Sequence, residues 1–167
     1  MSTFLFESER LGYREFIPED AGVLYRLNVD PEVIRYTGDP SFSSEEEARA
    51  FVLGYDRYRK HGYGRWGVIN KQDHEFLGWA GLKLVDGEVD LGYRFFREVW
   101  SQGYATEAAR ACIHYGFTKL GMTRIIARAL PENVASWKVL EKVGMKFIGF
   151  GECKGLEGAR LYEIVRS

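Results

Sequence analysis

Several short segments of the chain alternate apolar and polar residues, or form apolar runs bounded by turn residues, as β-strands do. They predict strands at 11–16, 66–69, 76–84, 89–96, 123–129, 145–150 and 161–165. A glycine-rich loop is expected between the last two, over 151–158. Strands therefore predominate over helices along the chain.

Apolar residues spaced three and four positions apart predict helices between these strands. Four helices are predicted. The first begins at Pro18, and the second follows a capping box of Ser43 and Glu46. The third spans Thr106 to Leu120, and the fourth spans Ala135 to Val143. The stretch 30–40, which contains Asp30-Pro31 and Gly38-Asp39-Pro40, is predicted to be a loop. The order of elements is mixed α/β, of the α+β kind.

The dipeptide Asp86-Gly87 predicts a hairpin and fixes the register of its two strands. The apolar face pairs Leu84 with Val89, Leu82 with Leu91 and Ala80 with Tyr93, and the mixed face pairs Lys83 with Asp90, Gly81 with Gly92 and Trp79 with Arg94. The Gly81–Gly92 pair leaves the middle of the mixed face bare. It is either space for another backbone or a thin ligand, or a bulge or twist point.

Composition narrows the class of protein. The 167 residues are 46% hydrophobic and fit a single domain spanning 1–167. With 23 basic and 24 acidic residues, the net charge of -1 argues against a nucleic-acid partner. The N-terminal segment lacks the pattern of a signal peptide, and no run reaches membrane-spanning length, so a cytoplasmic protein with no membrane partner is expected.

Cysteines and histidines do not indicate a metal site. Cys112 and Cys153 lack metal-ligand spacing, and Cys112 falls on the apolar side of its helix. His61, His74 and His114 show no mutual spacing for a metal either. No metal is expected.

The segment Val99 to Ala108 is the strongest candidate for ligand binding. It joins a strand to a helix, and Gly103 lets the backbone approach a ligand closely. Unpaired amides and the helix dipole make such a helix start suited to a phosphate. The Lys and Ser/Thr of a nucleotide P-loop and the early Gly-x-Gly-x-x-Gly of a dinucleotide fingerprint are missing. The other interpretation is a plain strand-to-helix turn.

These residues and three further motifs support a resemblance that covers essentially the whole chain. The motifs are Gly92-Tyr93, Trp100-Ser101-Gln102-Gly103-Tyr104-Ala105-Thr106-Glu107-Ala108, Asn133-Val134-Ala135-Ser136 and Glu141-Lys142-Val143-Gly144-Met145. In their order and spacing the chain resembles the GNAT superfamily of N-acetyltransferases. Its opening, with Ser8 to Arg14 and Pro18 to Ala21, is similar to the RimJ/RimL-like branch, the ribosomal-protein N-terminal acetyltransferases.

The resemblance implies a fold and a co-substrate. The fold is a twisted, mostly antiparallel mixed sheet flanked by helices, in which two central parallel strands splay apart. The co-substrate is acetyl-coenzyme A (acetyl-CoA). The residues implied to bind it are Phe95, Phe96, Trp100, Ser101, Gln102, Gly103, Tyr104, Ala105, Thr106, Asn133 and Ser136. Trp100 stands where the superfamily often has Gln or Arg.

Acyl transfer from a thioester to an amine needs a way to deprotonate the amine, an N–H donor for the carbonyl oxygen and a proton donor for the thiolate. The resemblance implies that backbone amides at the end of strand 89–96 donate hydrogen bonds to the thioester carbonyl oxygen. It also implies that Ser136 donates a proton to the departing sulfur. Asn133 would bind the pantetheine or acetyl end, and its alternative role is helix capping. A late tyrosine, Tyr162, is a further candidate acid.

Asp90 is the candidate base, or the carboxylate that positions a water, since this branch commonly carries an acidic residue two positions before Gly92-Tyr93. Its alternative role is a cross-strand ion pair with Lys83, worth about 0–1 kcal/mol if exposed. Two functions stay open: an N-acetyltransferase acting on a peptide N-terminus or small amine, and a non-catalytic acyl-CoA-binding module. The resemblance also implies a homodimer.

Overall fold

The computed structural model describes residues 4–167; Met1–Thr3, at the start of the segment expected to lack a signal peptide, lie outside the described residues. Within that range, eight strands form one sheet in the order β1-β2-β3-β4-β5-β6-β8-β7. The strands are β1 (Phe6–Glu7), β2 (Leu11–Arg14), β3 (Arg65–Asn70), β4 (Phe76–Val85), β5 (Glu88–Phe95), β6 (Arg124–Ala129), β7 (Lys146–Cys153) and β8 (Leu156–Val165). The helices are η1 (Pro18–Asp20), α1 (Ala21–Val29), α2 (Pro31–Ile34), α3 (Glu45–Leu53), α4 (Arg57–His61), η2 (Arg97–Val99), α5 (Tyr104–Thr118) and α6 (Val134–Lys142).

The central strands β5 and β6 run parallel, and the other neighbouring strands of the described chain run antiparallel. Pairing of β5 with β6 is limited to Asp90 with Ile126 and Leu91 with Ala127. Beyond Leu91 the two strands diverge, which opens the sheet at its centre. The predicted fold, a mixed sheet with two splayed parallel strands, is therefore confirmed.

The hairpin of β4 and β5 has the predicted register at each pair from Trp79–Arg94 to Leu84–Val89. A β-carbon at Gly81 would lie 2.2 Å from the carbonyl oxygen of Gly64, and one at Gly92 would lie 2.6 Å from a guanidinium nitrogen of Arg65. The bare middle of the mixed face is thus filled by another backbone and by an arginine side chain. Of the interpretations offered by the sequence, space for another backbone is the correct one.

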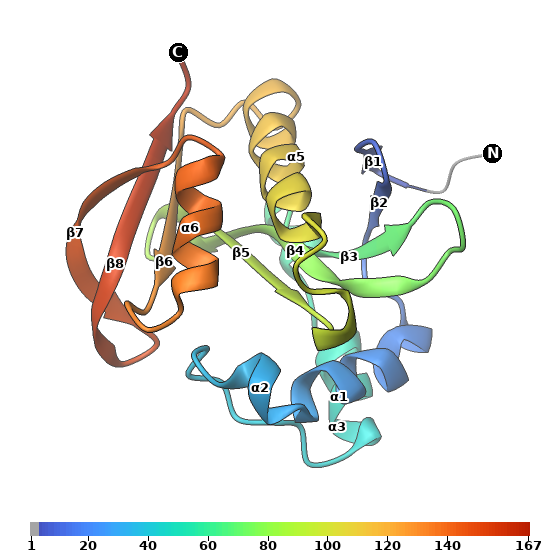
Figure 1. Cartoon of the computed structure of the whole chain (residues 1–167). Coiled ribbons are helices and arrows are strands. Elements are labelled where there is room, and N and C mark those ends of the chain that lie inside the picture. The colour runs from blue at the N-terminus through green and yellow to red at the C-terminus, as the bar shows by residue number, and fades with distance from the viewer. Residues whose placement is uncertain (1–3) are drawn as a thin grey trace.

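The two faces of the sheet carry different helices (Figure 1). The apolar face of β4 and β5 packs on α5 through buried residues that include Leu82, Leu91, Ala108 and Cys112, and α6 lies beside α5. A second core, around Phe16 and Leu24, joins α1 and α3 to the other face. No helix in residues 4–167 is long and apolar enough to cross a membrane.

The N-terminal half contains more regular structure than predicted. The expected loop over 30–40 includes α2, because the Asp30 side chain accepts a hydrogen bond from the Glu32 amide and Pro31 occupies the first helical position. The predicted capping box is wrong by one residue: Ser44, not Ser43, caps α3. The short elements β1 and α4 were not predicted either.

The predicted glycine-rich loop over 151–158 is wrong as well. The segment continues β7 to Cys153 and begins β8 at Leu156, and it turns at Lys154 and Gly155, both with positive φ. Gly149, Gly151 and Gly158 lie within strands, where register shifts accommodate the irregular pairing. Glycine content here reflects a distorted hairpin rather than a loop.

Candidate active site

A cavity of about 550 Å³ lies where β5 and β6 diverge. Its lining comes from β3, β4, β5, β6, the α6 region, the segment after α2 and the end of β7 with the turn that follows. Of the residues predicted for the site, Asp90, Asn133 and Ser136 line it together. Two segments distant in sequence, β5 and the start of α6, therefore meet at the splay.

The start of α5 has the geometry expected of an anion cradle. Ser101 and Gly103 both have positive φ, 65° and 82°, so the chain turns sharply into the helix. Helix geometry leaves the amides of Tyr104, Ala105 and Thr106 without an intrahelical acceptor, and the helix dipole of this 15-residue helix adds positive charge. Trp100, 43% exposed, donates from its indole to the carbonyl of Phe95 and so ties the loop to the end of β5.

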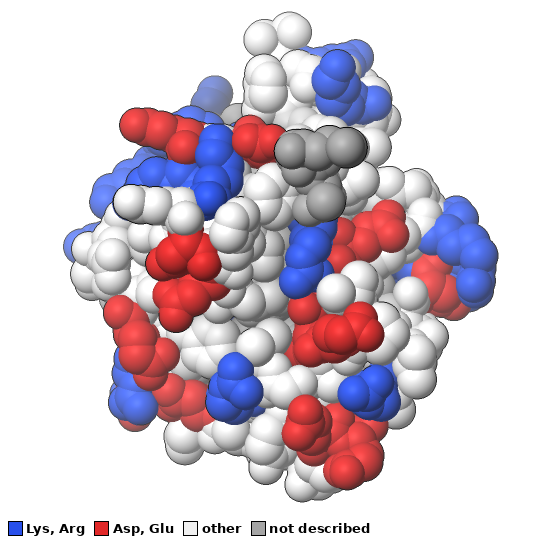
Figure 2. Space-filling view, turned by 90° about the vertical axis from the view of Figure 1, so that its right-hand side faces the viewer, with Lys and Arg blue, Asp and Glu red and all other residues white. Residues whose placement is uncertain are grey.

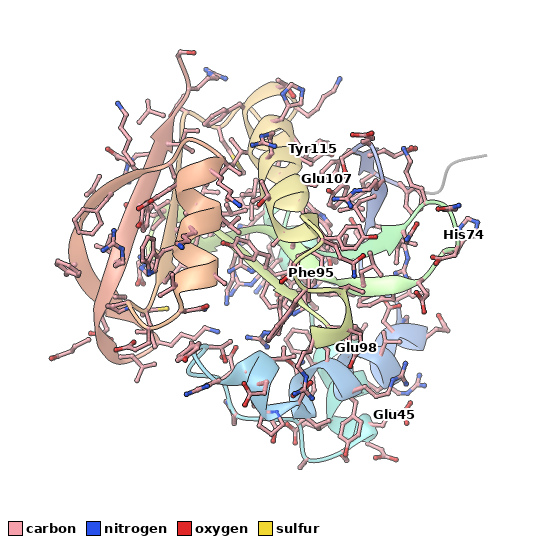
Figure 3. All side chains as sticks on the ribbon, in the orientation of Figure 1. Glu45, His74, Phe95, Glu98, Glu107 and Tyr115 are labelled. Atoms are coloured by element: carbon pink, nitrogen blue, oxygen red, sulfur yellow. The ribbon has the colours of Figure 1, made fainter. Side chains whose placement is uncertain are left out.

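A side-chain latch that the sequence analysis missed holds this loop. Arg10 donates to the carbonyl of Gln102 at 2.9 Å and to Glu107 at 2.7 Å, and Ser8 also donates to Glu107. Burial by itself raises the pKa of Glu107, but the hydrogen bonds from Ser8 and Arg10 outweigh it and hold that pKa below its usual value. Figure 3 shows Glu107 on the side of α5 that faces β1 and β2. The partners are 97 residues apart, so no local pattern reveals them.

Backbone amides at the end of β5 point in alternating directions. The Phe96 amide donates to the carbonyl of Leu77 at 3.0 Å, on the β4 side. Alternation along an antiparallel strand then directs the amides of Phe95 and Tyr93 to the other side, toward the gap next to β6. Phe95 lies at the end of β5 near the start of α5 (Figure 3). The Phe96 amide, also predicted to serve the ligand, is already bonded within the sheet.

Asn133 and Ser136 lie at the start of α6. Asn133 is the N-cap residue, yet its side chain makes no capping hydrogen bond. The capping role offered as its alternative is therefore not observed, and its amide group is left for the cavity that it lines. The Tyr93 hydroxyl donates to the carbonyl of Ser136 at 2.9 Å and lies 3.2 Å from its Oγ. Burial raises the pKa of Tyr93, which keeps this hydroxyl protonated.

Asp90 has different partners from the one expected. Lys83 lies opposite it in the register, but the Asp90 carboxylate binds Arg65 at 2.9 Å and Arg128 at 3.0 Å. Arg65 also donates to the carbonyls of Asp90 and Gly81. The predicted Lys83 ion pair is replaced by a clamp of two arginines, which joins β3, β5 and β6 through side chains.

The late tyrosine is placed away from this chemistry. Tyr162 is fully buried, donates to Glu141 at 2.9 Å and accepts from Arg160, and it is not among the residues that line the cavity. Cys112 is buried in the core, as expected. In residues 4–167 no three His, Cys, Asp or Glu side chains gather as a metal site would require.

On the face shown in Figure 2, basic and acidic side chains are interspersed rather than segregated. That face, on the side of β1 and β2, shows no continuous basic stripe of the kind that nucleic-acid binding uses.

Comparison with known proteins agrees with this geometry. A family model described as an acetyltransferase (GNAT) domain matches residues 10–146. A relative from Bacillus licheniformis, named uncharacterized N-acetyltransferase p20, is 34% identical over 143 residues, which are 83% of this chain and 80% of the relative.

Two solved structures show the same fold. A GNAT-family acetyltransferase from Bacillus anthracis is 29% identical, with a TM-score of 0.82 and coverage of 95% of this chain and 96% of that one. RimL, a ribosomal alpha-N-protein acetyltransferase in complex with coenzyme A, is 16% identical, with a TM-score of 0.77 over 95% of each chain. The latter likeness concerns the fold.

Proposed function

This chain belongs to the GNAT acetyltransferase family, and from that premise we propose that it transfers the acetyl group of acetyl-CoA to a primary amine. Within the family we propose the RimJ/RimL-like branch. Support for the branch comes from the opening motif of the chain and from its likeness in fold to RimL. A peptide N-terminus and a small amine are both acceptors of the proposed class.

The residues present fit acetyl-CoA. At Gly103, φ is 82° and an added β-carbon would lie 3.3 Å from Arg10, so the bare backbone at this turn is a requirement of the structure. Trp100 to Thr106 would hold the pyrophosphate through backbone amides and the helix dipole. Asn133, whose amide group caps no helix, would hold the pantetheine.

Each group on the cavity wall then has a chemical task. When bound, acetyl-CoA supplies a thioester whose carbonyl carbon the amine attacks and whose sulfur departs as the coenzyme A thiolate. The amides of Tyr93 and Phe95 point toward the gap and would donate hydrogen bonds to the carbonyl oxygen there, as an oxyanion site requires. Ser136 holds a proton at Oγ, and the Tyr93 hydroxyl at 3.2 Å keeps that side chain in place. Ser136 is the proposed proton donor to the sulfur, and Tyr93 positions it.

Asp90 is the proposed carboxylate on the acceptor side. One of its oxygens accepts from Arg65 and the other from Arg128, so each already carries a charge-assisted hydrogen bond and one acceptor site on each is left. Its proposed task is to position a water or the ammonium of the acceptor, and direct proton abstraction fits this geometry less well.

The observation that carries the proposal is the meeting of Asn133 and Ser136 with the open end of β5 at one cavity. The experiment titrates acetyl-CoA by calorimetry and then measures thiol release with peptide and small-amine acceptors. Acetyl-CoA binding with acceptor-dependent thiol release is expected. Binding without thiol release from any acceptor would favour the alternative, a non-catalytic acyl-CoA-binding module, and absence of binding would contradict both. A cytoplasmic location and a homodimer stay predictions.

A further inference from the structure

The cavity has a wall of charged side chains beside the mixed face of β4 and β5, contributed by β3, β4, β5 and β6 and here called the charged wall: Arg65, Lys83, Asp90, Arg94 and Arg128. Four of these five side chains are cationic. The arginines are largely buried, since the side chains of Arg65, Arg94 and Arg128 are 15%, 8% and 19% exposed. Trp79 packs against two of them, with its ring 5.4 Å from the Arg65 guanidinium and 5.0 Å from that of Arg94.

The carboxylates near this wall do not balance its cations. Arg65 and Arg128 share the single carboxylate of Asp90. Arg94 and Lys154 share the carboxylate of Asp39, each 2.6 Å from the same oxygen. Glu88, at 3.9 Å from Arg128, is already bound to Arg124. Positive charge is therefore left over inside the cavity.

Two further carboxylates of the lining, Asp86 and Glu152, lie at its exposed rim. Water screens their charge there, so they compensate buried cations weakly. The inner part of the cavity thus carries net positive charge and its rim carries negative charge, so an anion is favoured in the inner part.

Lys83 is the cation with room for a ligand. It is partly buried, and within residues 4–167 its ammonium has no hydrogen bond or ion pair. Burial lowers the pKa of Lys83, and the neighbouring Arg65, Arg57 and Lys154 lower it further, against a smaller opposing effect of Asp90. A bound carboxylate would stabilise the charged form of Lys83 and so offset the cost of burying its ammonium.

We propose that the acetyl acceptor is an amine that carries its own carboxylate, of the amino-acid class, and that Lys83 binds this carboxylate. The inference rests on the proposed acetyl transfer and names the substrate class for the same site. Along β5, Tyr93 is three residues beyond Asp90, the partner of Lys83 in the register, or about 10 Å. A lysine side chain extended toward Tyr93 would cover much of that length, so the amine and the carboxylate of the acceptor would be separated by only a few bonds.

The far side of the cavity favours a small acceptor over a long chain. Asp39, in the loop after α2, and Lys154, in the turn between β7 and β8, close an ion pair across 115 residues of sequence. Lys154 lines the cavity, and so do Tyr36 and Thr37, which precede Asp39 in the same loop. This ion pair bounds the cavity on that side, which favours a compact amino acid over a longer acceptor.

The test compares acceptors that differ in the α-carboxylate and little else: alanine with alaninamide, and leucine with leucinamide. The amine of an amino-acid amide is the less basic one, so an enzyme without a carboxylate site would acetylate the amide faster. We expect kcat/KM for the acid to exceed that for its amide by at least about tenfold. In Lys83→Gln this preference should disappear, whereas Lys60→Gln, at an exposed lysine of α4, should keep it.

A second measurement does not depend on turnover. Calorimetry with N-acetylalanine and N-acetylalaninamide should show tighter binding of the acid to wild type and equal binding to Lys83→Gln. Preference for amides, for spermidine or for peptide N-termini in the wild type would overturn the inference but leave acetyl transfer intact. An equal loss for acid and amide in Lys83→Gln would overturn it too. Failure to bind acetyl-CoA would instead contradict the proposed function.

Discussion

The cavity has two walls of different construction. The cofactor wall is made of β5 and the start of α6, and the start of α5 continues it outside the cavity lining; it offers backbone amides and the neutral side chains of Asn133 and Ser136. The charged wall offers buried arginines, Lys83 and Asp90. Backbone donors are fixed once the helix and strand form, whereas each charge needs a partner from a distant segment.

Because of this difference, the two walls are suited to recognise different kinds of ligand. The cofactor wall fits a ligand that stays the same, since amides and a helix dipole bind any phosphate in much the same way. The charged wall depends on particular side chains, and a few substitutions there would change the preferred acceptor. Substitutions on the cofactor wall should therefore change the binding or turnover of acetyl-CoA, whereas substitutions on the charged wall should change the preference for the acceptor.

Asp90→Asn should have the largest effect, because it leaves Arg65 and Arg128 without their shared carboxylate. Loss of one partner of a mostly buried pair predicts a decrease of about 3 kcal/mol in the free energy of unfolding, measured in urea. Asp56→Asn, at the exposed pair with Lys60, is the control and should show no measurable change. A stable Asp90→Asn variant with near-normal turnover from about pH 6 to pH 9 would remove Asp90 from both structure and mechanism.

Gly103→Val should weaken acetyl-CoA binding, by about 1.5–3 kcal/mol for the loss of one contact to the anion and more for steric exclusion. Gly62 is a matched control, because its φ of 83° equals that of Gly103 within a degree and nothing lies within 4 Å of an added β-carbon. Gly62→Val should be strained in the same way and bind acetyl-CoA normally. Equal affinities of the two folded variants would show that the α5 start is a plain turn.

Ser136→Ala should lower kcat by up to about 100-fold while leaving the affinity for acetyl-CoA close to normal, because its hydroxyl is the proposed proton donor to the leaving group. Tyr93→Phe, which removes the hydroxyl beside Ser136 and keeps the ring, should give a smaller loss of kcat. Steady-state kinetics with acetyl-CoA varied separates the two parameters. A Ser136→Ala enzyme altered in KM for acetyl-CoA alone would assign Ser136 to binding.

Asn133→Ala should have the smallest effect. It removes one hydrogen bond to the ligand, which corresponds to about 1 kcal/mol of binding and a several-fold rise in KM for acetyl-CoA. Thermal unfolding should be nearly unchanged, since the side chain caps no helix. A clear loss of stability with unaltered KM would restore the capping role.

The same contrast explains what could be predicted from the sequence. The hairpin register and the helix at Gly103 follow from local signals, a two-residue turn and a periodic apolar face, and both were predicted. The Arg10–Glu107 latch and the Arg65–Asp90–Arg128 clamp join residues that are 97, 25 and 38 positions apart. Such contacts depend on which strands become neighbours, so Lys83, adjacent in the register, was the expected partner of Asp90.

The short pairing between β5 and β6 has a consequence for native-state opening. Within the sheet, two register pairs and the ion pairs of Asp90 with Arg128 and of Glu88 with Arg124 join β1–β5 to β6–β8, whereas β4–β5 and β6–β8 are paired along most of their length. In hydrogen exchange, the two parts should behave as separate cooperative units that open along this boundary at a lower free energy than global unfolding. The place proposed to admit the substrates is then also the place where the sheet should separate first.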